Sequence, residues 1–128
     1  MIADASAITA IFFRRPGHLA LIDKLATAER AGIGAPTLAF TELALARDLG
    51  RNAHPLLARF LQEFGLVVVP FGEAHCRAAA EAFHRFGRGR HAAGLEPADC
   101  LAYATARLAR QPLLCQGRRF SRTDLELA

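Results

Sequence analysis

The sequence lacks the cysteine and histidine spacings that identify zinc sites and disulfide frameworks. Its three cysteines, Cys76, Cys100 and Cys115, form no CxxC pair, and an odd number does not suit a set of disulfides. The five histidines do not follow the spacing of zinc ligands either: His18, His54, His75, His84 and His91. We therefore expect core or half-buried thiols in a reducing compartment.

Segments that would cross or target a membrane are also missing. The longest apolar runs have the length of a strand and fall far short of a membrane span. Asp4 stands where a secretory signal would carry positive charge, so no such signal is recognised. The chain has 128 residues, of which 52% are hydrophobic, and no linker. We expect one soluble domain over residues 1–128 that stays in the cytoplasm.

The glycine-rich motifs of nucleotide-binding proteins are absent. No GxGxxG follows the first apolar segment, and no P-loop, GxSxG or HExxH is present. Nucleotide-binding and serine-hydrolase interpretations therefore have no support. The missing glycine loop also disfavours a small Rossmann-like regulator.

What the chain does have is a mild and uneven positive charge. The net charge is +4. The stretch from Arg77 to Arg122 carries only Glu81, Glu96 and Asp99 against a group of arginines: Arg77, Arg85, Arg88, Arg90, Arg107, Arg110, Arg118, Arg119 and Arg122. Clustered arginines suit contact with phosphate groups. A solubilising basic surface is the alternative, because charge alone does not identify nucleic acid as a partner.

Apolar runs of strand length alternate with segments of helical spacing. Strands are expected up to Asp4, just after a turn at 32–35, over 66–70 and over 112–115. Helices are expected over 6–13, 18–31, 36–49, 55–64, 73–86 and 97–110. The continuous run at 66–70 is typical of a sheet covered on both faces. This alternation predicts an α/β three-layer sandwich: a central parallel sheet of four to five strands with helices on both faces.

Three acids stand at or near the ends of these expected elements. Asp4 follows the first strand, Asp99 begins the last long helix, and Glu42 lies in the first turns of the helix at 36–49. In a parallel sheet, sites form at the carboxyl ends of the strands. Converging carboxylates repel each other unless a divalent cation lies among them, and oxygen ligands suit Mg²⁺ or Mn²⁺. The alternative for each acid alone is a helix cap or a solvated side chain.

Several stretches together carry a resemblance to a known family. The opening MIADASAI resembles the family's MIVDTSA, and APTL at 35–38 is followed by Glu42, six residues after Pro36. The most specific stretch is GRGRHAAGLEPADCLAYA at 87–104, which is similar to GKGRHxAGLNFGDCFAYA of one subgroup. QPLL before Gly117 and FSRTD after it continue the match. Over essentially its full length, the chain resembles a PIN-domain protein of the VapC type, the toxin of a bacterial toxin–antitoxin pair.

The resemblance implies a PIN-like fold with a five-strand parallel sheet, and a homodimer. It also implies a Mg²⁺-dependent endoribonuclease that acts on tRNA or rRNA and is inhibited by a small VapB-type antitoxin. Asp4, Glu42 and Asp99 match the family's catalytic and metal-holding acids, and Ser6 matches a supporting hydroxyl near the metal.

One position departs from the family pattern. Where the subgroup carries an acid after the last strand, this chain carries Arg118 and Arg119. A guanidinium near the carboxylates would neutralise them and compete with the metal. Asp124 is the only nearby acid and is the candidate for a partial, supporting substitute.

Two interpretations therefore stay open. In the first, the acids hold one metal weakly and the arginines grip RNA phosphate, so the protein is a nuclease. In the second, an ion pair of Arg118 or Arg119 with Asp99 closes the site and leaves a module that binds antitoxin or RNA without cleaving it. We favour the nuclease. The glycine-rich loop adds candidates for RNA contact, with a loop-surface role as the alternative: Arg88, Arg90 and His91.

Overall fold

Four short strands and six helices make up the chain, which the computed structural model describes from residue 1 to residue 128. The strands are β1 (Ile2–Ala3), β2 (Ala31–Gly34), β3 (Leu66–Val69) and β4 (Leu113–Leu114). The helices are α1 (Ala5–Phe12), α2 (His18–Thr27), α3 (Ala35–Leu49), α4 (His54–Phe64), α5 (Glu73–Phe86), α6 (Pro97–Ala109) and a 3-10 turn, η1 (Phe120–Arg122). None of the helices combines the length and apolar character needed to cross a membrane.

The strands form one parallel sheet in the order β3-β2-β1-β4. Ile2 of the central strand β1 pairs with Gly32 on one side and with Leu113 on the other. A single further bridge joins Leu113 to Leu127, so the C-terminal residues extend the sheet beyond β4. Four strands lie within the predicted range, and their parallel arrangement confirms the expected βαβ connections.

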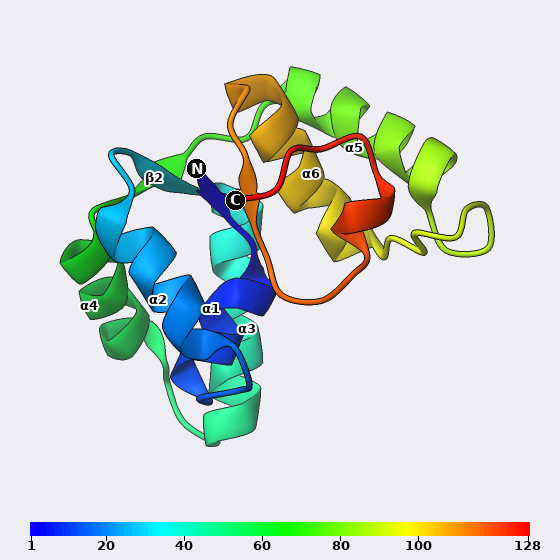
Figure 1. The fold of residues 1–128 in the computed structure, drawn as a ribbon. Coiled ribbons are helices and arrows are strands. Elements are labelled where there is room, and N and C mark those ends of the chain that lie inside the picture. The colour runs from blue at the N-terminus through cyan, green and yellow to red at the C-terminus, as the bar shows by residue number, and fades with distance from the viewer.

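A separate hydrophobic core fills each face of the sheet, because neighbouring residues of a strand point to opposite faces. Ile2 and Leu113 belong to the core formed with α5 and α6. Ala3 and Leu114 belong to the core formed with α1 to α4. Figure 1 shows α5 and α6 together on one side of the molecule and α1, α2 and α4 on the other. The predicted three-layer sandwich is confirmed.

Strand β3 differs from the prediction. Its continuous apolar run predicted a strand covered on both faces, yet β3 is the edge of the sheet. Val67 is 66% exposed and Val68 is 41% exposed. The composition of a strand does not reveal its position in the sheet. The apolar run at 66–70 therefore could not show whether the strand lies at the edge or in the centre of the sheet. The second strand also differs, because it occupies Ala31–Gly34, where a turn was predicted.

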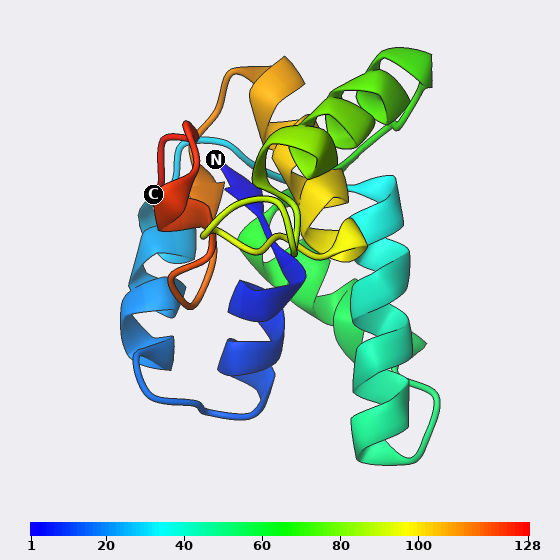
Figure 2. The same cartoon turned by 90° about the vertical axis from the view of Figure 1, so that its right-hand side faces the viewer.

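Gly34 allows β2 and the start of α3 to pass close to α6. A Cβ atom at this position would lie 2.4 Å from Oγ1 of the fully buried Thr105. Figure 2 shows the amino end of α6, in yellow, beside the place where β1 passes into α1. As a result, α1, α3 and α6 meet at the carboxyl end of β1.

Candidate active site

Asp4 lies where β1 ends and α1 begins, and its side chain caps the first turn of α1. Its Oδ2 accepts hydrogen bonds from the Ser6 amide (3.0 Å) and from the Ser6 hydroxyl (2.6 Å). Only 5% of Asp4 is exposed. Burial raises the pKa of the Asp4 carboxyl, the Ser6 hydrogen bonds oppose this, and the nearby charge of Asp99 raises it further. A nearby cation would stabilise the charged form of this carboxyl.

Asp99 lies in the first turn of α6. Its Oδ2 accepts hydrogen bonds from the Glu96 amide (2.8 Å) and from the Arg119 guanidinium (2.9 Å). The contact between a guanidinium and Asp99 that the second sequence interpretation required is therefore present. The side chain of Asp99 is 16% exposed, but that of Arg119 is 55% exposed. An ion pair so open to water contributes only about 0–1 kcal/mol, so a competing cation can displace the guanidinium.

Asp4 and Asp99 line the same two cavities. The first, of about 320 Å³, lies between α1, α3 and α6 and is also lined by Ser6 and Arg119. The second, of about 340 Å³, lies beside the loop after β4 and is lined by the same two aspartates and by residues 116–120. Both cavities open at the carboxyl ends of β1 and β4, where parallel sheets place their sites.

The structure does not bring Glu42 into this group. Glu42 Oε1 lies 2.6 Å from His54 Nδ1, and both residues line a separate apolar cavity between α3 and α4. Thr37 and Phe40, on another face of α3, line the first cavity instead. Since a helix turns by about 100° per residue, Glu42 points about 200° away from Phe40. The prediction that Glu42 joins the two aspartates is corrected by this geometry.

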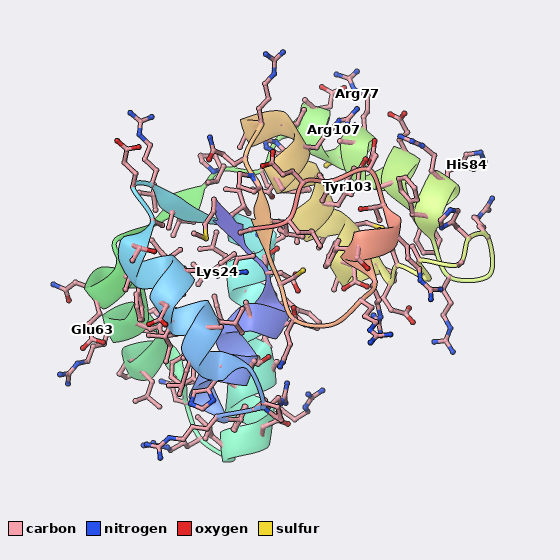
Figure 3. The ribbon with its side chains drawn as sticks, viewed as in Figure 1. Lys24, Glu63, Arg77, His84, Tyr103 and Arg107 are labelled. Carbon is pink, nitrogen blue, oxygen red and sulfur yellow. The ribbon has the colours of Figure 1, made fainter.

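Asp124 also lies away from the two aspartates. Its Oδ1 accepts a hydrogen bond from the Tyr103 hydroxyl (2.7 Å), and its Oδ2 lies 3.0 Å from Arg107 and 3.5 Å from Arg85. Burial alone would raise the pKa of Asp124, but the Tyr103 hydroxyl and the two guanidiniums hold it below its usual value. Figure 3 labels Tyr103 and Arg107 on α6. Asp124 therefore connects the C-terminal segment to α5 and α6. It does not lie beside Asp4 and Asp99, where a supporting role was predicted for it.

The arginines and histidine predicted to contact RNA lie at different distances from the cavities. Arg88 reaches the rim of the first cavity through an ion pair of 2.8 Å with Glu96, which lines it. Arg90 and His91 make their contacts within their own loop and with α5. Arg118 lines the second cavity. Arg88 and Arg118 are therefore placed at the site, whereas the other two are not.

Sequence reasoning missed most of the residues that line the first cavity, among them Arg15, Thr37, Phe40, Ala44, Arg47, Asp48 and Glu96. Thr37, Phe40 and Arg47 follow the three- and four-residue spacing of one helix face. This spacing was the available signal, because it identifies the face of α3 that turns toward α1 and α6. Arg15 comes from the turn after α1, and no local pattern marks it.

The acids present suit one water-rich divalent cation and do not suit a three-carboxylate site. No group of three or more His, Cys, Asp or Glu side chains is placed to hold a metal ion. Mg²⁺ is often held by one or two carboxylates and keeps several waters or binds substrate phosphates. Asp4 and Asp99 offer two carboxylates that line both cavities. Asp48 and Glu96 also line the first cavity, but each forms an ion pair with an arginine, Asp48 with Arg47 and Glu96 with Arg88. The guanidinium of Arg119 competes for this place, because it occupies an oxygen of Asp99.

Replacing Ser6 by alanine is expected to raise the pKa of the Asp4 carboxyl further. The variant loses the hydroxyl hydrogen bond that favours the charged form, while burial stays the same. Because its pKa is raised on folding, Asp4 contributes most to the free energy of unfolding below its ordinary pKa of 3.8. This contribution is lost as the pH rises through the folded-state pKa, and in Ser6→Ala the loss extends to higher pH.

A carboxyl ¹³C NMR titration measures the pKa of Asp4 in both proteins. Ser121→Ala is the matched control, because Ser121 is the only other serine and its hydroxyl donates to the Arg118 carbonyl. The control is expected to keep the wild-type pKa at Asp4. An Asp4 pKa that is unchanged or lower in Ser6→Ala would contradict the assigned role of the hydroxyl.

Comparison with known proteins agrees with the fold. Residues 1–126 match the family model described as PIN domain. The chain is 41% identical over 127 residues to ribonuclease VapC36 of Mycobacterium tuberculosis, which covers 98% of this chain and 91% of the relative.

Two solved structures share the architecture. The crystal structure of Mycobacterium tuberculosis VapC20, described as a sarcin–ricin loop cleaving toxin, superposes with a TM-score of 0.79 at 16% identity, covering 99% of this chain and 97% of that one. VapBC2 from Rickettsia felis, bound to a DNA fragment from its promoter, gives a TM-score of 0.71 at 17% identity, covering 100% and 98%. At such identities these two matches show the fold alone. Together with the family model and the relative at 41% identity, they establish that the chain belongs to the PIN-domain family, in its VapC group.

Proposed function

We propose that the chain is the toxin of a type II toxin–antitoxin pair and acts as an endoribonuclease that hydrolyses RNA phosphodiester bonds. Its relative at 41% identity is named a ribonuclease and matches almost the whole chain. The observation that carries the proposal is the placement of Asp4 and Asp99 on one cavity with arginines around it. The proposed substrates are tRNA or rRNA.

In this proposal Asp4 and Asp99 hold a Mg²⁺ or Mn²⁺ ion. Such an ion, when bound, supplies an activated water and neutralises the charge that develops on the phosphodiester. Ser6 orients the Asp4 carboxylate through two hydrogen bonds, and the Glu96 amide does the same for Asp99. Both carboxylates are therefore held in place before the substrate arrives, which lowers the cost of reorganisation during the reaction.

The arginines on the first cavity are suited to the RNA backbone. Arg15, Arg47 and Arg119 all line it, and a guanidinium can bind two phosphate oxygens at once. Arg119 has two alternative anions within its reach, the Asp99 carboxylate and an incoming phosphate. Turning to the phosphate would free Asp99 for the cation.

A PIN module that binds without cleaving is the alternative, and it requires Arg119 to stay on Asp99. The guanidinium is 55% exposed, so the ion pair is worth about 0–1 kcal/mol. An interaction of this size does not close the site against a divalent cation and a phosphate that arrive together. The nuclease is therefore better supported than the inactive module.

The proposed protein partner is a small VapB-type antitoxin. Support comes from the fold shared with VapBC2, which was solved as a toxin–antitoxin assembly on DNA. A homodimer, which the family resemblance implies, completes the proposal.

Incubation of the purified protein with labelled tRNA and rRNA tests the function. We expect discrete cleavage with Mg²⁺ or Mn²⁺, loss of cleavage in excess EDTA, and recovery when Mg²⁺ exceeds the chelator. Cleavage that continues in EDTA would contradict the metal-dependent mechanism. No cleavage of either RNA under any of these conditions would contradict the nuclease itself.

A further inference from the structure

We propose that Phe40, with Thr37, Arg15 and Arg47 around it, forms a subsite that holds one unpaired nucleotide of single-stranded RNA. In this subsite the base stacks on the Phe40 ring and the arginines contact the flanking phosphates. The inference rests on the proposed function for its substrate class. It assigns to the α3 side of the first cavity a binding role that the two aspartates do not have.

Phe40 is placed unlike any other phenylalanine of the chain. The sequence has nine phenylalanines, and Phe40 is the only exposed one, with 48% of its surface accessible to solvent; the others are buried or half-buried. It lines the first cavity, which Asp4 and Asp99 line as well. An open aromatic face on a cavity of about 320 Å³ is a suitable platform for one base, because every base has a face that can stack.

Thr37, one helical turn before Phe40, provides an independent sign of a ligand. It is only 3% exposed, and its Oγ1 is the one buried side-chain polar atom without a hydrogen-bond partner. Thr41, the next threonine on the helix, satisfies its hydroxyl by donating to the Thr37 carbonyl at 2.7 Å. A buried hydroxyl without a partner is costly, so a ligand group or water in the cavity would satisfy Thr37.

Two guanidiniums beside Phe40 offer contacts to phosphate, although the cavity as a whole is also lined by four carboxylates: Asp4, Asp48, Glu96 and Asp99. Arg15 and Arg47 line the same cavity, and the Arg47 side chain is 76% exposed and pairs only with its neighbour Asp48. Stacking on an aromatic ring combined with flanking guanidiniums is how proteins hold single-stranded nucleic acid. A protein segment that docks on the apolar side of α3 would instead use Leu43 as well. Leu43 is 70% exposed but does not line the cavity.

The test is the binding of fluorescein-labelled single-stranded RNA in EDTA, measured by fluorescence anisotropy, so that cleavage does not interfere. Phe40→Ala is expected to weaken binding about tenfold, because stacking of one base is typically worth about 1–3 kcal/mol. Phe40→Trp, which keeps a stacking surface, is expected to bind within about twofold of the wild type. Leu43→Ala is the matched control on the same helix and is expected to bind as the wild type does.

An oligonucleotide without bases separates stacking from phosphate contact. On this ribose–phosphate chain, the wild type and Phe40→Ala are expected to bind equally. Equal binding of normal RNA by the wild type and Phe40→Ala would overturn the inference, as would an equal loss in Leu43→Ala, which indicates a protein-docking face. If the protein binds RNA in a Phe40-dependent way but cuts nothing with Mg²⁺, the nuclease fails and the subsite stands. Thermal melting of each variant confirms that it is folded.

Discussion

Asp4→Asn is expected to lower the rate of RNA cleavage by about a hundredfold or more and to raise the stability of the fold. Activity falls because the variant loses one of the two carboxylates proposed to hold the metal, and removal of a single group that stabilises a transition state typically costs about 10²–10³ in rate. Stability rises because burial disfavours the Asp4 charge, which asparagine lacks. The Asn oxygen can still accept the hydrogen bonds from Ser6.

These opposite effects separate a catalytic carboxylate from a structural helix cap. If Asp4 served only to cap α1, replacement would leave the metal-dependent cleavage rate unchanged in folded protein. Cleavage rates at saturating Mg²⁺ and urea unfolding at pH 7 measure the two effects. Glu42→Gln is the matched control, because Glu42 pairs with His54 on another cavity. It is expected to cut RNA within about twofold of the wild type, and a large loss in this variant would restore Glu42 to the site.

Arg119→Ala is expected to lower the Mg²⁺ concentration needed for half-maximal cleavage by up to about fivefold, because an ion pair worth about 0–1 kcal/mol no longer competes. The variant frees an oxygen of Asp99 from a hydrogen bond of 2.9 Å. It also removes a positive charge that lies beside the place where a cation would bind. The cleavage rate is therefore measured over a range of Mg²⁺ concentrations in both proteins.

Arg118→Ala controls for a general loss of positive charge. Arg118 lines the second cavity but forms no ion pair with Asp99, so its loss is expected to change the Mg²⁺ requirement by less than about threefold. An Arg119→Ala protein with the wild-type Mg²⁺ requirement would show that the guanidinium does not compete with the metal. Weaker RNA binding in EDTA by Arg119→Ala would agree with its second role as a phosphate contact.

Local patterns in the sequence were sufficient for the layers of the fold and for the places of Asp4 and Asp99 at the ends of their elements. Asp4 directly follows a short apolar strand, and Asp99 stands in the first turn of a helix rich in small residues. The position of Asp4 follows from the end of β1, and the position of Asp99 follows from the start of α6. The sheet then brings them together, because β1 and the amino end of α6 meet at one edge.

Glu42 shows where such patterns are insufficient. Its distance from Pro36 matched a family motif, but its angular position on α3 turns it toward α4 and His54. Which face of α3 lines the cavity depends on how α3 packs against α1 and α6. A local sequence motif does not contain this information. Val67 and Val68 illustrate the same limit in the sheet, since their exposure depends on which strands lie beside β3. The contact of Arg119 with Asp99 belongs to the less favoured of the two sequence interpretations, which rested on the family position where arginines replace an acid.

Equilibrium binding of Mn²⁺, followed by electron paramagnetic resonance of the free ion, tests the central claim most directly. The claim is that Asp4 and Asp99 hold one divalent cation for which Arg119 competes. It predicts one Mn²⁺ per chain in the wild type, at least tenfold weaker binding in Asp4→Asn, and binding up to about fivefold tighter in Arg119→Ala. Glu42→Gln should bind as the wild type does. Binding that Glu42→Gln abolishes and Asp4→Asn leaves intact would contradict the account.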